Sequence, residues 1–310
     1  MEISIIVPVC NEEKNIKTFL RRTENVLNNI KKSYEIIFAL DPSTDNTEKI
    51  ILEEIKRNKN IKLLVFSRQF GQPAATMAGI INCKGSYCVI IDVDLQDPPE
   101  IIEQLYNKIN LGYEVVYAKR KSRKGETFIK KLISSVGYYV INKLSDVRIP
   151  RDVGDYRIIS RKVIDHLKKL NESHGFLKGM VAFVGFNQTY IEYDRDNRYA
   201  EKGKYNKFFG SLKIGINGLI GFSSRPLFFM SVVGFVIAFF SFILGIWYFF
   251  QKISGIDLTL GLTTTVILIS FFAGVQLLGL GLLGEYIGRI YDEVKKRPKY
   301  IVDKKINFND

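Results

Sequence analysis

Two uncharged apolar stretches near the end of the chain limit most strongly what this sequence can fold into. Residues 227–250 and 258–283 contain no Asp, Glu, Lys or Arg. Each exceeds the ~20 residues that a helix rising about 1.5 Å per residue needs to cross the hydrocarbon core of a bilayer. The link between them, QKISGID, has seven residues. The sequence therefore predicts two transmembrane helices joined as a hairpin.

The charges around this hairpin predict its orientation. Basic residues lie on both sides of it, namely Lys202, Lys204, Lys207, Lys213 and Arg225 before it and Arg289, Lys295, Lys296, Arg297 and Lys299 after it. The link contains only Lys252. Because basic flanks stay inside, and because the opening MEISIIVPV lacks the basic region of a signal peptide, we expect both termini in the cytoplasm. The expected location is the cell (inner) membrane, as a multi-pass protein.

The first 120 residues alternate short β-rich runs with helical patterns. The expected strands are residues 3–9, 34–40, 61–66 and 87–91, and the expected helices are residues 12–30, 45–57, 72–81 and 99–111. This alternation predicts an α/β domain with a doubly wound, Rossmann-like and mostly parallel sheet. In such sheets, ligands bind at the carboxyl ends of the strands.

The run VIIDVDLQDPPE, residues 89–100, places acids where one expected strand ends. Asp94 and the amide of Gln96 are two residues apart on an extended segment and therefore face the same side. Such oxygen ligands suit a hard divalent cation whose coordination is completed by phosphate oxygens. Asp92 lies one step deeper, where it could hold a sugar or ribose hydroxyl. Aspartates at strand ends also act as caps or turn formers, so the motif alone leaves a structural role open.

The formal net charge of +13 and the pI of about 9.4 favour an anionic partner. Charge alone does not choose among nucleic acid, an anionic lipid surface and phosphorylated substrates. The run KRKSRKGETFIKK, residues 119–131, follows an expected strand over residues 114–118 and contains Arg120 and Arg123. It is either a solvated loop or an anion-binding segment. No nucleic-acid-binding motif is recognisable, so we expect no nucleic acid partner.

A series of motifs runs in order along essentially the whole chain. They are SIIVPVCNEEKNI, EIIFALDPSTDNT, RQFGQPAATMAGI, DVDLQDPPE, DVGDYRIISRKV, FLKGMVAFVGF, RYAEKGKYNKF and GFSSRPL, followed by the hairpin. In these motifs the chain resembles the polyprenyl-phosphate branch of glycosyltransferase family 2, which includes dolichol-phosphate mannose synthase and the bactoprenol glucosyltransferases. The resemblance implies a cytoplasmic GT-A domain, then an interfacial helix and the transmembrane hairpin.

The resemblance also implies roles for single residues. The expected nucleotide-sugar site consists of Pro8, Glu12, Asp41, Asp92 and Asp94, with Asp41 reading the base. The expected cofactor is Mg²⁺ or Mn²⁺, held by Asp94 and Gln96, and Asp155 is expected beside the reacting sugar. The expected ligands of the lipid phosphate or the diphosphate are Arg120, Arg123, Arg198 and Lys204. Pro8 could equally end a strand, Asp41 form a turn, and Arg198 be a solvated charge.

Three departures from the family pattern stand out. Leu40-Asp41-Pro42-Ser43 replaces the usual Asp-Asp-Gly-Ser, which leaves the contacts to the base open. Gly175-Phe176 replaces a typical Arg-Phe pair, and Glu201-Lys202-Gly203-Lys204 replaces the usual Gly-Lys-Ser-Lys. The identity of the sugar therefore cannot be copied from any one relative.

The implied reaction is inverting transfer of a hexose, with a UDP-sugar favoured as donor, to undecaprenyl phosphate at the cytoplasmic face. The product would be a lipid-linked sugar donor for cell-envelope glycans. Asp94 and Asp155 are the expected catalytic residues, although an acceptor phosphate that is already anionic needs no strong base. One alternative is a non-catalytic membrane-anchored scaffold that retains the fold. A processive polysaccharide synthase is disfavoured, because the only tryptophan, Trp247, lies inside the first apolar stretch and cannot belong to a Gln-x-x-Arg-Trp motif.

These expectations divide the chain into four parts. They are a GT-A domain over residues 1–204, a juxtamembrane amphipathic segment over 205–226, the hairpin over 227–284, and a cytoplasmic basic tail over 285–310. The hairpin is expected to contact membrane lipid, and the amphipathic segment is expected either to lie on the membrane surface or to pack on the GT-A domain. Glycines at positions 274, 279, 281 and 284 provide close-packing surfaces, either within the hairpin or in a homo-oligomer.

Overall fold

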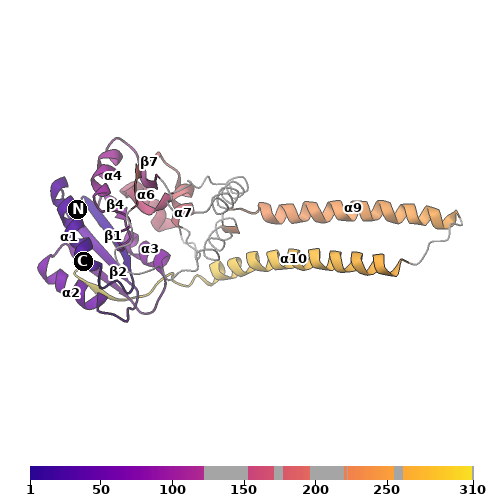
Figure 1. Cartoon of the computed structure of the whole chain (residues 1–310), viewed down its shortest axis with the longest axis horizontal. Helices are drawn as coiled ribbons and strands as arrows, with labels where there is room; N and C mark the ends of the chain where they lie inside the picture. Colours follow the sequence, from indigo (N-terminus) through magenta and orange to yellow (C-terminus); the bar gives the residue numbers. More distant parts are fainter. Residues whose placement is uncertain (122–152, 171–176, 196–219, 222, 255–260, 309–310) are drawn as a thin grey trace.

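An α/β domain and two long helices that extend from it side by side make up the computed structural model of the chain (Figure 1). The structure describes residues 1–121, 153–170, 177–195, 220–221, 223–254 and 261–308. The strands are β1 Ile3–Val9, β2 Tyr34–Leu40, β3 Ile61–Phe66, β4 Tyr87–Ile90, β5 Val115–Arg120, β6 Val153–Ser160, β7 Gln188–Tyr193 and β8 Val302–Ile306. The helices are α1 Ile16–Ile30, α2 Thr47–Arg57, α3 Gln72–Asn82, α4 Ile101–Ile109, α6 Arg161–Lys169, α7 Leu177–Val184, α9 Arg225–Ile253 and α10 Leu262–Lys295.

Within the described residues, the strands form one eight-stranded sheet in the order β7-β5-β6-β4-β1-β2-β3-β8. β6 and β8 run antiparallel to their neighbours, and the other strands are parallel to one another. The predicted mostly parallel, doubly wound α/β sheet is therefore confirmed. Parallel order brings the carboxyl ends of β1, β2, β3, β4, β5 and β7 to the same edge, which is where such folds bind ligands.

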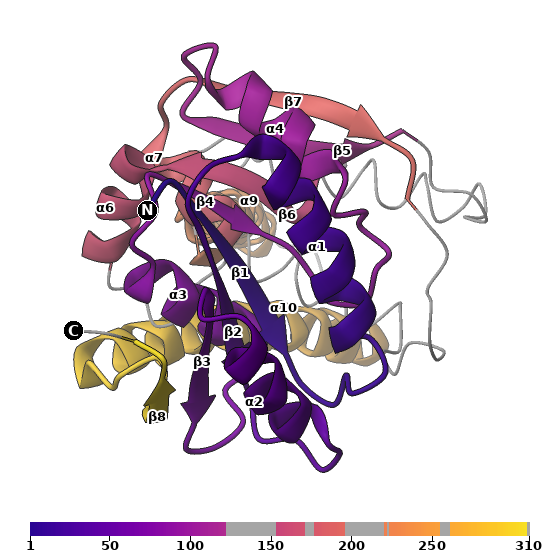
Figure 2. The same ribbon diagram turned by 90° about the vertical axis from the view of Figure 1, so that its left-hand side faces the viewer.

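Helices cover both faces of the sheet (Figure 2). Successive residues of a strand point to opposite faces, so Ile5 belongs to a buried cluster with residues of α1, α2 and α4, while Ile6 belongs to a second cluster with residues of α3, α6 and α7. All seven residues of β1 are buried. Burial on both faces explains why the strands read as continuous apolar runs in the sequence.

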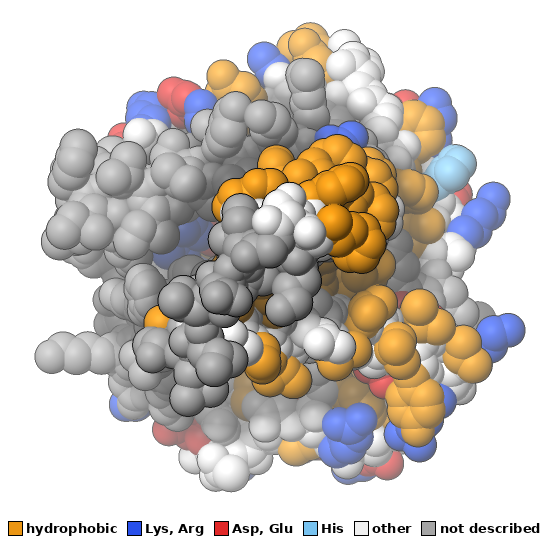
Figure 3. Space-filling view, turned by 90° about the vertical axis from the view of Figure 1, so that its right-hand side faces the viewer, with side chains coloured by type: hydrophobic (Ala, Val, Ile, Leu, Met, Phe, Trp, Pro, Cys, Tyr) orange, Lys and Arg blue, Asp and Glu red, His pale blue; other side chains and the backbone are white. Residues whose placement is uncertain are grey.

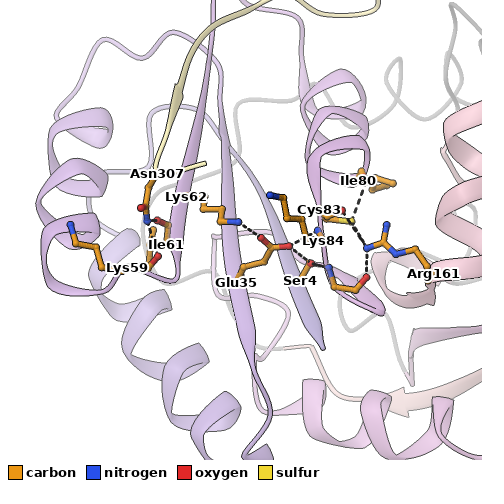
Figure 4. A network of polar contacts seen from close by, with 11 residues as sticks. Ser4, Glu35, Lys59, Ile61, Lys62, Ile80, Cys83, Lys84, Arg161 and Asn307 are labelled. Atoms are coloured by element: carbon orange, nitrogen blue, oxygen red, sulfur yellow. Dashed lines mark hydrogen bonds and ion pairs between the residues drawn. The ribbon is translucent and has the colours of Figure 1, made fainter. Parts of the chain in front are cut away.

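The C-terminal segment returns to the sheet, which corrects its expected description as a basic tail. α10 continues to Lys295, and β8 then pairs antiparallel with the edge strand β3. The side chain of Asn307 donates hydrogen bonds to the carbonyl oxygens of Lys59 and Ile61, at 2.7 and 2.6 Å (Figure 4). β8 contains Asp303, Lys304 and Lys305, and exposed charges of this kind are common on edge strands because they discourage pairing with other chains.

The two apolar helices of the expected hairpin are present as α9 and α10. Both are long and apolar enough to cross a membrane, over Arg225–Gln251 and Thr265–Lys295. A stripe on α9 with a spacing of seven residues is 63–72% exposed, and it consists of Phe228, Phe235, Phe242 and Phe249. Figure 3 views the far end of the hairpin, where hydrophobic side chains gather over these helices. Apolar surface on this scale is unfavourable in water and suits lipid.

A buried polar network joins the amino ends of the strands, at the edge opposite the ligand-binding edge (Figure 4). Glu35 is fully buried and accepts hydrogen bonds from Ser4 Oγ, Lys62 Nζ and the backbone N–H of Lys84, each at 2.6 Å. Burial alone would raise the pKa of Glu35, but these hydrogen bonds outweigh it and hold that pKa below its usual value. The network therefore links β1, β2, β3 and the turn before β4 through one ionised carboxylate.

Candidate active site

A cavity of about 300 Å³ opens at the carboxyl ends of β1, β2 and β4. This volume lies at the lower end of the range typical of small-molecule sites. The cavity is lined by Pro8, Val9, Cys10, Glu12, Asp41, Gln69, Gly71, Gln72, Ala75, Asp92, Val93 and Asp94. All five residues predicted to border a nucleotide sugar are among them. The structure thus brings together residues at and beyond the ends of four strands, β1, β2, β3 and β4.

Asp92 lies in a cluster of like charges. Burial, and after it the neighbouring carboxylates of Asp155, Asp97 and Asp94, together raise the pKa of Asp92 to about 7. Gln72, at the first position of α3, donates a hydrogen bond from Nε2 to Asp92 Oδ1 at 2.8 Å. Repulsion among four carboxylates favours a bound cation, because an opposite charge restores the ionised form.

Asp94 and Gln96, the expected metal ligands, are placed differently. Asp94 is 7% exposed, lines the cavity, and accepts the backbone N–H of Gln96 on Oδ1 at 3.2 Å. The intervening Leu95 has a φ of +61°, so the chain turns sharply here. Gln96 does not line the cavity. Of this predicted pair, the structure therefore places only Asp94 on the cavity wall.

The acids fit a cation that is only partly enclosed by protein. Across the described ranges, no three His, Cys, Asp or Glu side chains are arranged to enclose a metal ion. Mg²⁺ typically binds through one or two carboxylates, with waters and substrate phosphates completing its shell. Asp94, with the charge of Asp92 nearby, suits this kind of site.

Asp41 has a structural task that the sequence analysis did not predict. It is 3% exposed, and its Oδ1 and Oδ2 accept the backbone N–H groups of Phe70 and Gly71 at 3.0 and 2.9 Å. Gly71 has a φ of +86°, a conformation that favours glycine, and it comes directly before α3. Asp41 therefore holds the loop that carries Gln72 into the cavity. A contact between Asp41 and a nucleotide base stays a prediction.

The loops after β1 and β2 are joined by side-chain caps. The backbone N–H of Glu12 donates to Thr47 Oγ1 at 2.8 Å, and the backbone N–H of Thr44 donates to Asn11 Oδ1 at 2.7 Å. Asp45 accepts the backbone N–H of Thr47 at 3.0 Å. The polar residues of PVCNEE and LDPSTDNT thus order this side of the cavity.

The remaining predicted residues are distributed unevenly. Asp155, near the start of β6, is ion-paired with Arg157 at 3.3 Å and acts electrostatically on Asp92. Arg120, at the end of β5, is 3.9 Å from Asp97. The other three predicted phosphate ligands, Arg123, Arg198 and Lys204, lie outside the described residues.

Sequence analysis missed four residues in or near the acidic cluster around Asp92. They are Gln72, Asp97, Tyr193 and Arg195. Asp97 belongs to the acidic run that was singled out, and its extra carboxylate was a signal that could have been used. Tyr193 ends β7 and Arg195 follows it, in a stretch with no motif, and only the pairing of β5 with β7 brings them to Asp97.

Comparisons with known proteins agree with this architecture. The family described as Glycosyl transferase family 2 matches residues 4–168. The uncharacterized glycosyltransferase YkcC of Bacillus subtilis is 41% identical, covering 98% of this chain and 94% of the relative. The SfII prophage-derived bactoprenol glucosyl transferase of Shigella flexneri is 38% identical, covering 98% of both chains. The bactoprenol glucosyl transferase of Shigella phage SfV is 37% identical, covering 97% of this chain and 98% of the relative.

A solved structure supports the fold. Glucosyl-3-phosphoglycerate synthase from Mycobacterium tuberculosis, in complex with Mn²⁺, UDP-glucose and phosphoglyceric acid, matches with a TM-score of 0.51 and 17% sequence identity. The match covers 71% of this chain and 79% of that chain. At this identity the likeness concerns the fold alone, and it fits the GT-A arrangement expected for the α/β domain.

Proposed function

The chain belongs to glycosyl transferase family 2, and from this premise we propose that it transfers a hexose from a nucleotide sugar to the phosphate of a polyprenyl lipid. One observation carries the proposal. The same chain contains an acidic cavity at the carboxyl ends of its strands and two apolar helices long enough to cross a membrane. Relatives named bactoprenol glucosyl transferase align along nearly the full length, including these helices. Undecaprenyl phosphate is the acceptor we favour.

The donor we favour is a UDP-sugar with Mg²⁺ or Mn²⁺. Asp94 would hold the cation, with Gln96 as its predicted second ligand, and Asp92 would bind a sugar or ribose hydroxyl. Pro8, Glu12 and Asp41 would border the nucleotide. The cation would supply Lewis-acid stabilisation of the charge that develops on the departing nucleoside diphosphate.

The reaction we propose is a single displacement. An oxygen of the acceptor phosphate forms a bond to the anomeric carbon while the bond from that carbon to the diphosphate breaks, so the configuration inverts. Because the second pKa of a phosphate monoester is about 6, the acceptor is already anionic near neutral pH. Asp155 would then orient the acceptor or take a residual proton.

Bringing an anionic lipid to an anionic donor requires positive charge nearby. Arg120 supplies such a charge at the end of β5. Arg123, Arg198 and Lys204, which lie outside the described residues, are proposed to add to it. Lipid phosphate and donor diphosphate would both gain from bidentate contacts to arginine.

The membrane placement follows from the two apolar helices. α9 begins beside the α/β domain (Figure 1). The segment after α10 ends in the same domain, because β8 belongs to its sheet. We propose that the domain and both termini lie at the cytoplasmic face of the inner membrane, with the link between α9 and α10 on the other side. A homo-oligomer stays a prediction.

The test uses the full chain purified in detergent. We would incubate it with Mn²⁺ or Mg²⁺, undecaprenyl phosphate and a panel of UDP- and GDP-sugars, and analyse the lipid by mass spectrometry. We expect one glycosyl phosphate lipid, and we expect Asp94→Asn and metal chelation to abolish it. Metal-dependent nucleotide binding without product from any donor would contradict the proposal and favour a non-catalytic scaffold.

A further inference from the structure

Asp97 is a buried carboxylate that the proposed reaction does not use. It follows Asp94 by three residues and is 2% exposed. It accepts a hydrogen bond from Tyr193 Oη and a second from Arg195 Nε at 3.2 Å, and Arg120 lies 3.9 Å away. One carboxylate thus faces two guanidinium groups beside the cavity. A buried charge costs free energy unless it is paired, so these contacts favour one arrangement of Asp97 and its partners.

The partners of Asp97 come from two other strands. Arg120 ends β5 and Tyr193 ends β7, and these two residues lie directly opposite each other in the parallel pair. Arg120 Nε also donates to Tyr193 Oη at 3.5 Å. The Tyr193 ring packs edge-on against Tyr156, with 6.0 Å between ring centres. Backbone pairing and aromatic packing therefore hold Tyr193 in place.

Arg120 has a site shaped for it. A Cβ atom built on Gly154 would lie 3.1 Å from Arg120 Nη2, so any larger residue would press on the guanidinium. The side chain of Arg120 is 24% exposed and that of Arg195 is 28% exposed. Both guanidinium groups are thus held at the rim of the site and not in bulk solvent.

The same two arginines act electrostatically on the acidic cluster. Arg195 opposes the rise in the pKa of Asp92, and Asp92 contributes to raising the pKa of Arg120. Guanidinium groups bind carboxylates bidentately and strongly. Without Asp97, the carboxylate of Asp92, which already acts electrostatically on both arginines, could pair with them in competition with a divalent cation.

We propose that Asp97 is a positioning residue that holds Arg120 and Arg195 away from Asp92, and thereby limits their competition with a divalent cation for the acidic cluster. The inference rests on the proposed function for the identity of the cation site. It assigns Asp97 no contact with substrate. Its effect is to separate the positive groups that face phosphates from the negative groups that face the metal.

The experiment measures cation binding without turnover. Mn²⁺ is titrated into the full chain in detergent with UDP present, and free Mn²⁺ is followed by electron paramagnetic resonance. We expect Asp97→Asn to weaken Mn²⁺ binding about tenfold, because two arginines then compete for the acidic cluster. Asp97→Glu, which keeps the charge, should stay within about threefold of the wild type.

A double variant separates this role from a structural one. Adding Arg195→Gln to Asp97→Asn should bring Mn²⁺ binding back to within about threefold of the wild type, because one competing cation is removed with its counterion. A merely structural role would leave the double variant as weak as the single one, or weaker. If Asp97→Asn alone does not fold, the double variant decides by the same threefold criterion.

Two results would overturn the inference: Mn²⁺ affinity unchanged in Asp97→Asn, or no recovery in the double variant. Failure of the proposed function is recognised separately. Wild-type protein that binds Mn²⁺ and UDP but makes no glycosyl lipid would contradict the reaction and leave the comparison of Mn²⁺ affinities intact.

Discussion

The backbone N–H of Phe70 donates a hydrogen bond to Asp41 Oδ1 at 3.0 Å, although the two residues follow different strands. Gly71 donates to the other oxygen of the same carboxylate. The loop before α3 is therefore ordered by a side chain from the loop after β2. Since α3 carries Gln72, this contact sets the wall of the cavity as well as the stability of the loop.

We expect Asp41→Ala to destabilise the α/β domain and to weaken nucleotide binding. The substitution leaves two backbone N–H groups without their acceptor, which costs about 1–3 kcal/mol for each buried group. Urea unfolding followed by circular dichroism, together with UDP binding, measures both effects. Asp303→Ala, which removes an exposed carboxylate from β8, is the control. If Asp41→Ala unfolds like the wild type and only changes the preference between UDP and GDP, Asp41 reads the base instead.

Gln72→Leu should lower kcat/KM without unfolding the domain. The change removes the 2.8 Å hydrogen bond to Asp92, and hydrogen bonds to charged groups contribute about 1.5–3 kcal/mol. The expected loss is roughly tenfold to a hundredfold in glycosyl transfer. Thr76→Val is the control. It changes a polar residue one turn further along α3 and tests whether any disturbance of this helix lowers kcat/KM. Equal losses in both variants would show that the effect comes from the helix and not from Asp92.

Sequence patterns predicted strands that are buried on both faces of the sheet. Ile3–Val9 is apolar except for Ser4 because both faces of β1 are covered, so its strand is evident from the residues. β8 was missed because three of its five residues, Asp303, Lys304 and Lys305, are charged, and its partner β3 lies far away in sequence. The second apolar helix was predicted to end at residue 283, where the apolar run ends, whereas α10 continues through charged residues to Lys295.

The sequence predicted several residues that line the candidate site, but not which hydrogen bonds and ion pairs connect them. Asp92 and Asp94 stand out because they follow an apolar strand. The partner of Asp97, Tyr193, is 96 residues away in sequence, so no local spacing could reveal the contact. Asp41 was assigned to the base by resemblance, and its hydrogen bonds to a distant loop become visible only once β2 and β3 are paired.

Glu35→Gln should destabilise the protein at neutral pH and much less in acid. The folded-state pKa of Glu35 is lowered from its usual 4.5, so its contribution to stability is present above pH 4.5 and is lost as the pH falls through the lowered value. The difference in free energy of unfolding between wild type and variant should therefore shrink between pH 7 and pH 3. Glu53→Gln, on the exposed side of α2, is the control. A difference that stays constant over this range would contradict the assignment.

Lys62→Met probes the same network from its other side. Glu35 is fully buried and Lys62 is 2.6 Å from it, so removing the lysine leaves a buried carboxylate without its counterion. Breaking a buried pair in this way costs about 3–5 kcal/mol. Because the network lies at the edge opposite the cavity, the fraction that stays folded should keep its KM for the donor. A raised KM in Lys62→Met would show that the two edges of the sheet are coupled.

The pairing of β8 with β3 predicts the membrane topology. Residues on both sides of the hairpin belong to one sheet, so we expect α9 and α10 to leave and re-enter the bilayer on the same side, with the link between them on the other side. A cysteine at position 254, introduced as Ser254→Cys at the end of α9, should react with a membrane-impermeant maleimide on intact cells. The native Cys10, on the cavity wall, should react only after the cells are permeabilised and so provides the internal control. Labelling of the introduced cysteine only after permeabilisation would show that the hairpin does not expose its link outside, and labelling of Cys10 on intact cells would reverse the proposed orientation.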